Sequence, residues 1–301
     1  MTIDNAKPKL VVIVGPTASG KTALSLKLAK KFRGEIVSAD SRAVYKYLNI
    51  GSAKPSPKER QGVRHHLLDV VKPNETLSLA QYKELATKAI LDIQRHGKLP
   101  ILVGGTALYI YAVIDNWLIP EVPPNEKLRA RLEKQSAAKL FQQLLKKDPE
   151  AKNFIDPQNK RRIIRALEII AATKKPFSQQ RAHGPQLFDT LILGVKKEAD
   201  ETKKNITKRT QQMLKTGLVI EVKKLLKKGY SPSSPALSGI HYKEIIDHLE
   251  GKMTLAKAVA LINKNDEQLV RRQMTWFKKD SRIRWVKNQK EAEKLVKKLA
   301  R

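Results

Sequence analysis

Hydrophobic positions follow two alternating patterns over the first 115 residues of the chain. Residues 9–14 (KLVVIV) form a short run of apolar, mostly β-branched side chains, which predicts a buried strand of a parallel sheet. Similar runs predict strands at 35–39, 67–71 and 99–103. Apolar residues at helical spacing predict helices over 23–31 and 79–94. This alternation of strands and helices indicates an α/β fold with a parallel sheet.

The pattern changes near residue 115. Three prolines between 117 and 125 interrupt it, and only helical periodicity follows from 127 to 173. An apolar run at 191–195 predicts a strand that returns to the sheet, and the remainder is mostly helical with a short strand at 283–286. We therefore expect three segments: residues 1–115 as the first part of a core, 116–190 as a helical insertion, and 191–301 as the completion of the core.

Composition narrows the classes of function. The 301 residues carry a formal net charge of +31, and 41% of them are hydrophobic, which fits a globular protein that meets an acidic partner such as nucleic acid. A generally lysine-rich surface would explain the same charge. The absence of cysteine excludes disulfides, thiolate zinc sites and a cysteine nucleophile. No apolar stretch near the start is long enough for a signal segment or a membrane span, so we expect a cytoplasmic protein without a membrane partner.

The strongest local signal is a phosphate-binding loop. Residues 15–22 match G-x-x-x-x-G-K-[ST], with a predicted strand before them and a helix after them; they are Gly15, Pro16, Thr17, Ala18, Ser19, Gly20, Lys21 and Thr22. Glycines allow successive backbone N–H groups to point at an anion, and the start of the helix adds its positive dipole end. Lys21 is expected to reach terminal phosphoryl oxygens, and the Thr22 hydroxyl is expected to bind Mg²⁺.

The loop motif alone does not identify its ligand, because the usual metal-binding carboxylate is missing. The strand at 99–103 runs into Gly104, Gly105 and Thr106 rather than into the aspartate that holds Mg²⁺ in many nucleoside triphosphatases. Asp40 follows the strand at 35–39 instead, and it could serve as a catalytic base or as a metal anchor. The loop could therefore bind a pyrophosphate without hydrolysing ATP, although a small-molecule or nucleoside kinase stays an alternative.

A longer series of segments resembles one family, the tRNA dimethylallyltransferases, also called isopentenyl-pyrophosphate transferases. Beyond the phosphate loop, the matching segments include 38–41 with Val44-Tyr45, 50–55, 65–69, 102–106 with Leu108-Tyr109, 165–168, 242–244, and Arg272-Gln273 with 275–277. They occur in order over nearly the whole chain. A phosphate loop alone is common, whereas this ordered series is specific.

The resemblance implies a reaction and an architecture. Members of the family transfer a dimethylallyl group from dimethylallyl pyrophosphate to N6 of the adenosine at tRNA position 37, just 3′ of the anticodon. It implies an α/β, P-loop-kinase-like core with an inserted all-helical domain that binds the tRNA anticodon stem-loop. By this resemblance Asp40 is the base, Arg209 contacts the pyrophosphate and Thr22 holds Mg²⁺. We expect the enzyme to act as a monomer.

The resemblance also implies which residues meet the tRNA. They are Asp40, Ser41, Arg42, Ala43 and Thr106 near the target base, and Arg129, Arg161, Arg162, Ile163, Ile164 and Arg165 on the insertion. The spacing of Arg162 and Arg165 supports their contact with RNA, because residues three apart share a helix face and both side chains can point toward phosphate. An ion pair of Arg165 with Glu168 is the competing explanation.

Several positions depart from the family pattern. Ala43 replaces the glutamine that reads the target adenine, Ala107 replaces a glycine of G-G-T-G, His241 replaces the glycine of I-G-Y-K-E, and Asn205 replaces an arginine upstream of Arg209. The residues expected to bind pyrophosphate match the family pattern more closely than the residues expected to recognise the base. The changes at Ala43 and His241 leave a basic RNA-binding protein without catalysis as a further hypothesis, although the intact Lys21, Thr22 and Asp40 argue against it.

A histidine pair raises the question of a metal site. His65 and His66 have no partner at ligand spacing, so a strand-edge pair with one ring packed inward is the preferred interpretation.

Overall fold

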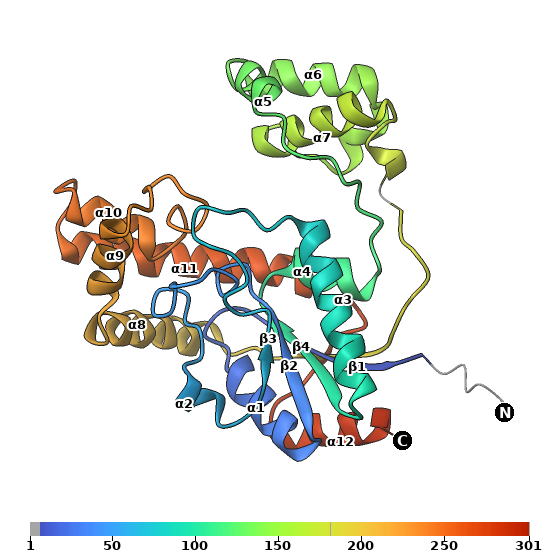
Figure 1. Ribbon diagram of the computed structural model, residues 1–301, viewed down its shortest axis with the longest axis vertical. Coiled ribbons are helices and arrows are strands. Elements are labelled where there is room, and N and C mark those ends of the chain that lie inside the picture. The colour runs from blue at the N-terminus through green and yellow to red at the C-terminus, as the bar shows by residue number, and fades with distance from the viewer. Residues whose placement is uncertain (1–6, 181, 301) are drawn as a thin grey trace. The chain divides into compact units, whose positions relative to one another are not determined.

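The protein folds into two compact units. The computed structural model describes residues 7–180 and 182–300. The core unit consists of the chain up to Ile114 together with the chain from Leu187 onward, and the insertion unit is Asp115–Gln186. Figure 1 shows the strands of the core unit and the helices of the insertion unit. From the sequence the return to the sheet is expected after residue 190, whereas the insertion unit ends at Gln186.

The core unit is built on a six-stranded sheet in which every pairing of adjacent strands is parallel. The strand order is β3-β2-β4-β1-β5-β6. The strands are β1 (Lys9–Val14), β2 (Gly34–Ala39), β3 (His65–His66), β4 (Leu99–Gly104), β5 (Asp189–Gly194) and β6 (Arg284–Trp285). Parallel strands end at the same edge of the sheet, so the segments after β1, β2, β4 and β5 meet there. The predicted α/β fold with a parallel sheet is confirmed.

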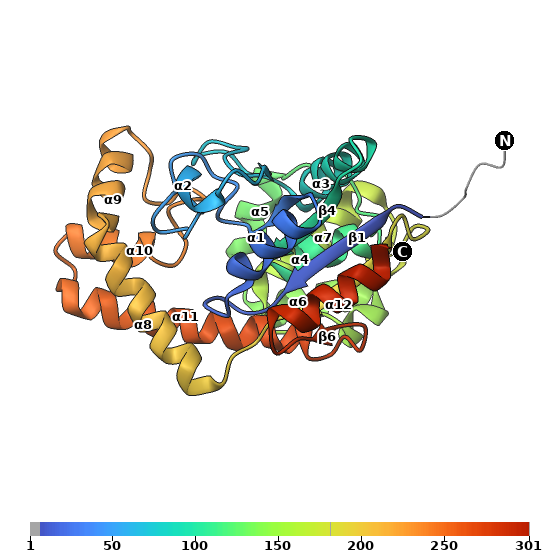
Figure 2. The same ribbon diagram turned by 90° about the horizontal axis from the view of Figure 1, so that it is seen from below.

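Helices cover both faces of this sheet. Helices α1 (Lys21–Lys31) and α12 (Gln289–Ala300) share a hydrophobic core with Val11 and Ile13 of β1. The alternate residues of β1 point to the opposite face and are also fully buried. Helix α3 (Leu79–Arg95) contacts the inner strands β2 and β4, and α4 (Ala107–Ile114) contacts α3 and β4. Figure 2 shows α3 and α4 beside β4.

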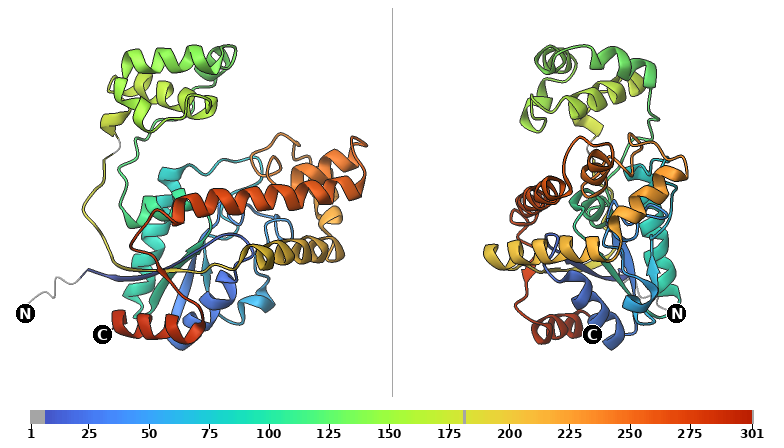
Figure 3. Two further views of the ribbon diagram at one scale, coloured as in Figure 1. Left: turned by 180° about the vertical axis from the view of Figure 1, so that it is seen from behind. Right: turned by 90° about the vertical axis from the view of Figure 1, so that its left-hand side faces the viewer.

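A second group of helices follows β5 and lies beside the carboxyl edge of the sheet (Figure 3). They are α8 (Ala199–Lys215), α9 (Leu218–Lys227), α10 (Tyr242–Leu249) and α11 (Leu255–Phe277). Helix α11 packs against α8, α10 and α4, and so connects this group to the sheet unit. Thr254 caps α11 by accepting a hydrogen bond from the backbone N–H of Lys257. A single-turn helix, α2 (Pro57–Arg60), precedes β3.

Among the described residues of the insertion unit the regular elements are helices joined by loops, and the β-pairing is one isolated bridge between Trp117 and His183. Its helices are α5 (Glu126–Glu133), α6 (Ala137–Lys147) and α7 (Lys160–Thr173), with short 3₁₀ turns η1 (Pro149–Asn153) and η2 (Ser178–Gln180). Each of the three α-helices begins at a side-chain cap, from Asn125, Ser136 or Asn159. Leucine and isoleucine side chains on all three helices form the core of this unit.

One predicted strand is wrong. The apolar run at 67–71 lies outside the sheet, and the edge strand β3 is formed by His65–His66 instead. Leu67 and Asp69 have left-handed backbone angles (φ 61° and 57°), which an extended strand cannot contain. Within the described residues, no helix is long and apolar enough to cross a membrane.

Candidate functional site

The loop between β1 and α1 forms a cradle of backbone groups. Gly15 has φ 148°, and a Cβ added there would lie 2.1 Å from the carbonyl oxygen of Val195, so only glycine fits. Gly20 has φ 94° and is the N-cap residue directly before α1. This geometry matches the predicted phosphate-binding loop at the amino end of a helix.

Lys21 is held inside this loop. Its Nζ donates to the carbonyl oxygen of Pro16 at 2.5 Å. Loss of water around the ammonium group lowers the pKa of Lys21 to about 8; nearby Asp40 raises this pKa and Arg209 lowers it further. An anion bound in the loop would favour the protonated lysine, as expected of a residue that binds phosphoryl oxygens.

Arg209 reaches the same loop from α8. Its Nη1 donates to the hydroxyl of Thr17 at 2.5 Å, and its Nη2 donates to Asp266 Oδ2 at 2.8 Å. Asp266 lies on α11 and its side chain is 1% exposed. The structure thus places Arg209 at the loop, as the resemblance implies, and anchors it on a buried carboxylate.

Asp40 follows β2 and lines the same cavity as the phosphate loop. Its Oδ1 accepts hydrogen bonds from the backbone N–H groups of Arg42 (2.7 Å) and Ala43 (3.3 Å), which fix the carboxylate at the edge of the sheet. The hydroxyl of Thr106 accepts from the backbone N–H of Ser41 at 3.1 Å. These contacts join the ends of β2 and β4 beside the cradle.

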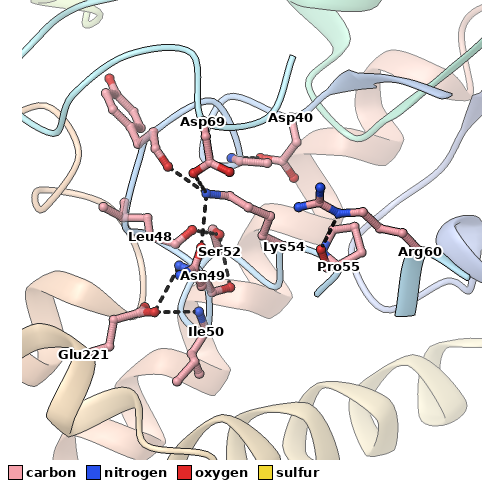
Figure 4. Close-up of polar contacts among 12 residues, drawn as sticks. Asp40, Leu48, Asn49, Ile50, Ser52, Lys54, Pro55, Arg60, Asp69 and Glu221 are labelled. Atoms are coloured by element: carbon pink, nitrogen blue, oxygen red, sulfur yellow. Dashed lines mark hydrogen bonds and ion pairs between the residues drawn. The ribbon is translucent and has the colours of Figure 1, made fainter. Parts of the chain in front are cut away.

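The loop 48–55 forms a further wall of the cavity, and Figure 4 shows its contacts. The Nζ of Lys54, whose side chain is 2% exposed, donates to Asp69 Oδ1 and to the carbonyl oxygen of Tyr45, both at 2.7 Å. Burial lowers the pKa of Lys54, although Asp69 opposes this shift.

Glu221 on α9 fixes the same loop from outside. Its carboxylate accepts the backbone N–H groups of Asn49, Ile50 and Gly51 at 2.8–3.1 Å, as well as the hydroxyl of Tyr242 at 2.7 Å. The first two of these contacts are drawn in Figure 4.

Gln273 joins two sides of the site. Its Oε1 accepts the backbone N–H of Thr17 at 2.8 Å, and its Nε2 donates to the carbonyl oxygen of Gly105 at 3.0 Å. The cavity lies within the core unit, is open to solvent on one side and has a volume of about 290 Å³. Of the predicted residues it is lined by Thr17, Ala18, Ser19, Gly20, Lys21, Thr22, Asp40, Ala43 and Arg209.

Other predicted residues of the core unit do not line this cavity. Gly15 and Pro16 shape the loop from behind, and Ser41 and Thr106 bond to each other at its margin. Arg42 donates to the carbonyl oxygens of Pro235 and Ala236, so here its guanidinium stabilises a neighbouring loop.

The predicted tRNA contacts of the insertion unit fall into three groups. Ile163 and Ile164 are buried in the core of that unit, so their expected contact with RNA is wrong for their side chains. Arg129 and Arg165 both donate to Glu168, whose side chain is 1% exposed; the alternative ion pair of Arg165 is therefore present. Arg161 and Arg162 are exposed at the start of α7.

The cavity offers oxygen ligands for Mg²⁺ but no complete protein cage. Within residues 7–180 and 182–300, no group of three or more His, Cys, Asp or Glu side chains could hold a metal ion. The Thr22 hydroxyl and the Asp40 carboxylate line the cavity, and Mg²⁺ commonly takes its remaining ligands from substrate phosphates and water. The residues present therefore fit a magnesium ion shared with a pyrophosphate.

The histidine pair forms part of the sheet edge. His66 Nε2 lies 2.6 Å from Glu35 Oε2, and His65 Nδ1 lies 2.9 Å from the carbonyl oxygen of Val63. Lys98 also donates to Glu35, so this carboxylate neutralises a basic corner of the sheet.

Sequence reasoning assigned no role to Gln273, Asp266 or Glu221. The spacing of Asp266, Leu269 and Gln273 (i, i+3 and i+7) places them on one face of α11, and this pattern could have indicated that Asp266 and Gln273 face the site together. Glu221 belongs to a segment, Glu221-Val222, that matches the family pattern, but the match did not reveal its partners, which are the Tyr242 hydroxyl and backbone groups about 170 residues earlier in the chain.

The comparisons with known proteins agree with this geometry. The sequence model of the IPP transferase family matches residues 43–280. The tRNA dimethylallyltransferase of Roseiflexus sp. (strain RS-1) is 46% identical over 274 residues, which is 90% of each chain. The enzyme of that name from Pelotomaculum thermopropionicum is 39% identical over 100% of this chain and 98% of its own.

Comparison with solved structures also finds tRNA prenyltransferases. The full-length tRNA isopentenylpyrophosphate transferase from Bacillus halodurans superposes with a TM-score of 0.74, at 36% identity and 97% coverage of both chains. A eukaryotic dimethylallyltransferase, solved while acting on tRNA, superposes with a TM-score of 0.77 at 30% identity, over 89% of this chain and 69% of its own. With a phosphate cradle, an arginine and a carboxylate around one cavity, the chain belongs to the tRNA dimethylallyltransferase family.

Proposed function

We propose that this enzyme transfers a dimethylallyl group from dimethylallyl pyrophosphate to N6 of the adenosine at tRNA position 37 and releases pyrophosphate. The observation that carries the proposal is the convergence of Lys21, Arg209 and Asp40 on one cavity of the core unit. The first two can bind an anionic leaving group, and the third can accept a proton beside it.

Each residue has a defined part in the reaction. The new bond joins N6 to the first carbon of the dimethylallyl group, while the bond from that carbon to the pyrophosphate oxygen breaks and its electron pair leaves with pyrophosphate. The loop N–H groups, Lys21 and Arg209 stabilise the charge that develops on this oxygen. Asp40 accepts the proton released from N6. A magnesium ion held by Thr22 and the pyrophosphate would supply further neutralisation of negative charge.

The target base has to leave its stack to enter such a cavity, at a cost of a few kcal/mol. We propose that the segment Asp40–Ala43, of which Asp40 and Ala43 line the cavity, meets the extruded adenine together with Thr106 at the margin of the site. The exposed Arg161 and Arg162 of the insertion unit are proposed to contact phosphates of the anticodon stem-loop. Arg129 and Arg165 would contribute the part of each guanidinium that stays exposed beside Glu168.

The test uses labelled dimethylallyl pyrophosphate, Mg²⁺ and a tRNA anticodon stem-loop, followed by digestion to nucleosides. We expect label on N6 of the adenosine 3′ of the anticodon, and its loss when that adenosine is replaced by guanosine. The Asp40→Asn variant should bind the donor normally but transfer it about 10²–10⁴-fold more slowly. Wild-type turnover by that variant would reject Asp40 as the base, and RNA-independent ATP turnover would favour the kinase.

A further inference from the structure

His241 occupies a strained backbone conformation next to the site. The residue before α10, it has φ 77° and ψ −44° and is 6% exposed. A non-glycine residue in such a region costs of order 1–3 kcal/mol, and it persists only where surrounding contacts hold it. The family pattern described above has glycine at this position, so the histidine side chain demands its own explanation.

Both nitrogens of the His241 ring face acceptor oxygens. Nδ1 lies 2.7 Å from the carbonyl oxygen of Gly51, and Nε2 lies 3.0 Å from Asp266 Oδ2. The backbone N–H of His241 donates to Glu244 Oε2 at 2.8 Å. Through these two contacts the side chain links the cavity loop 48–55 to the carboxylate that anchors Arg209.

The anchor of Arg209 is a single oxygen atom. Asp266 Oδ2 accepts from both Arg209 and His241, whereas Asp266 Oδ1 and Arg209 Nε are buried without a hydrogen-bond partner among the described residues. A guanidinium held through one oxygen lacks the fixed orientation of a bidentate pair. The orientation of the carboxylate therefore depends on its second donor, His241.

The electrostatics of the pair agree with this arrangement. Burial alone would raise the pKa of Asp266, but the hydrogen bonds and charges of His241 and Arg209 outweigh burial and lower it. The carboxylate therefore stays ionised between its two donors.

We propose that His241 is a positioning residue: its Nε2 hydrogen bond fixes Asp266, and Asp266 in turn directs Arg209 at the phosphate loop. The inference rests on the proposed function of Arg209 at the pyrophosphate. His241 lies outside the cavity, yet it is expected to affect both the binding of pyrophosphate and the departure of the leaving group.

Three substitutions separate positioning from a purely structural role. His241→Gln places its amide nitrogen near the former Nε2 and can keep the contact with Asp266. His241→Asn places its amide nitrogen near the former Nδ1 and keeps only the contact with Gly51. Asparagine and glycine tolerate a left-handed backbone better than glutamine does. Backbone strain therefore predicts greater thermal stability for Asn and Gly, whereas positioning predicts greater activity for Gln.

The first measurement is kcat for dimethylallyl transfer, with the KM for tRNA. We expect His241→Gln to stay within about threefold of wild type, while His241→Asn and His241→Gly lose about tenfold in kcat at unchanged KM for tRNA. In an Asp266→Asn background the same histidine substitutions should have no additional effect, because the link is already broken. Activity that follows thermal stability across the three variants would overturn the proposal.

Titration calorimetry with inorganic pyrophosphate is the second measurement, and it does not depend on catalysis. We expect the affinity to fall about tenfold in His241→Asn and to be kept in His241→Gln. Equal affinities in the two variants would overturn the positioning role. Absence of dimethylallyl transfer by the wild type would reject the proposed function instead, and the calorimetric comparison would still decide the role of His241.

Discussion

The ion cluster around Glu168 gives the most quantitative prediction for the insertion unit. The carboxylate accepts two hydrogen bonds from Arg129 (2.8 and 2.9 Å), one from Arg165 and one from the backbone N–H of Asn125 (2.7 Å). It therefore joins α5 to α7 at their polar side. The Glu168→Gln substitution removes the charge with little change of shape and leaves two arginines without their counter-ion.

The cost can be worked out from the pKa. Burial would raise the pKa of Glu168, but donors from Arg129, Asn125 and Arg165 outweigh it and hold the pKa at about 2. Relative to the ordinary value of 4.5, this corresponds to about 3 kcal/mol at neutral pH. The carboxylate is favoured by folding, so the contribution is complete above pH 4.5 and is lost as the pH falls toward 2.

Hydrogen exchange measured by mass spectrometry on peptides of α5 and α7 tests this value. We expect Glu168→Gln to lower the opening free energy by about 3 kcal/mol at pH 7 and by about 1 kcal/mol at pH 3. Glu133→Gln is the matched control, because Glu133 pairs with Lys160 at 3.3 Å on the surface and should cost less than about 1 kcal/mol. Equal losses in the two variants, or a deficit that does not change with pH, would refute the reasoning.

Three further predictions concern the core unit and the RNA. Pyrophosphate affinity should fall about fivefold between pH 8 and pH 9, as Lys21 with its pKa of about 8 loses its proton; calorimetry on Lys21→Met should show no such fall. Gly51→Ala should destabilise the core unit in thermal melts and reduce turnover, because the new Cβ would lie 2.6 Å from the ring of Tyr242; wild-type melting would contradict this. Affinity for the anticodon stem-loop should fall steeply with salt, and the slope of log K against log salt should decrease by about 1–2 when Arg161 and Arg162 are both replaced by alanine, as filter binding can measure.

The elements that the sequence predicts well are those with a strong local pattern. The apolar run of β1 and the glycines of the phosphate loop each encode their geometry within a few residues. The strand expected at 67–71 failed because an apolar run does not reveal that Leu67 and Asp69 adopt left-handed angles, which the surrounding contacts impose.

The candidate site was predictable to a similar extent. Asp40 and Lys21 could be assigned because each lies directly after a predicted strand or within a known loop pattern. The chain of contacts from Gly51 through His241 and Asp266 to Arg209 could not be predicted, because its members come from a loop, the cap of α10 and the helices α11 and α8, which only the folded chain brings together. A substitution noted in the sequence as a departure thus proved to be part of the network.

Helix α11 determines how mutations far from the site can affect the alignment of its residues. Asp266 and Gln273 are two turns apart on it, and they hold the arginine anchor and the phosphate loop respectively. Because both attachments belong to one rigid rod, a small tilt or rotation of that rod displaces them together. Mutations at distant points along its buried side, such as Ile262 or Phe277, would therefore alter the alignment of the whole anion-binding apparatus at once, and the two attachments are not free to drift independently.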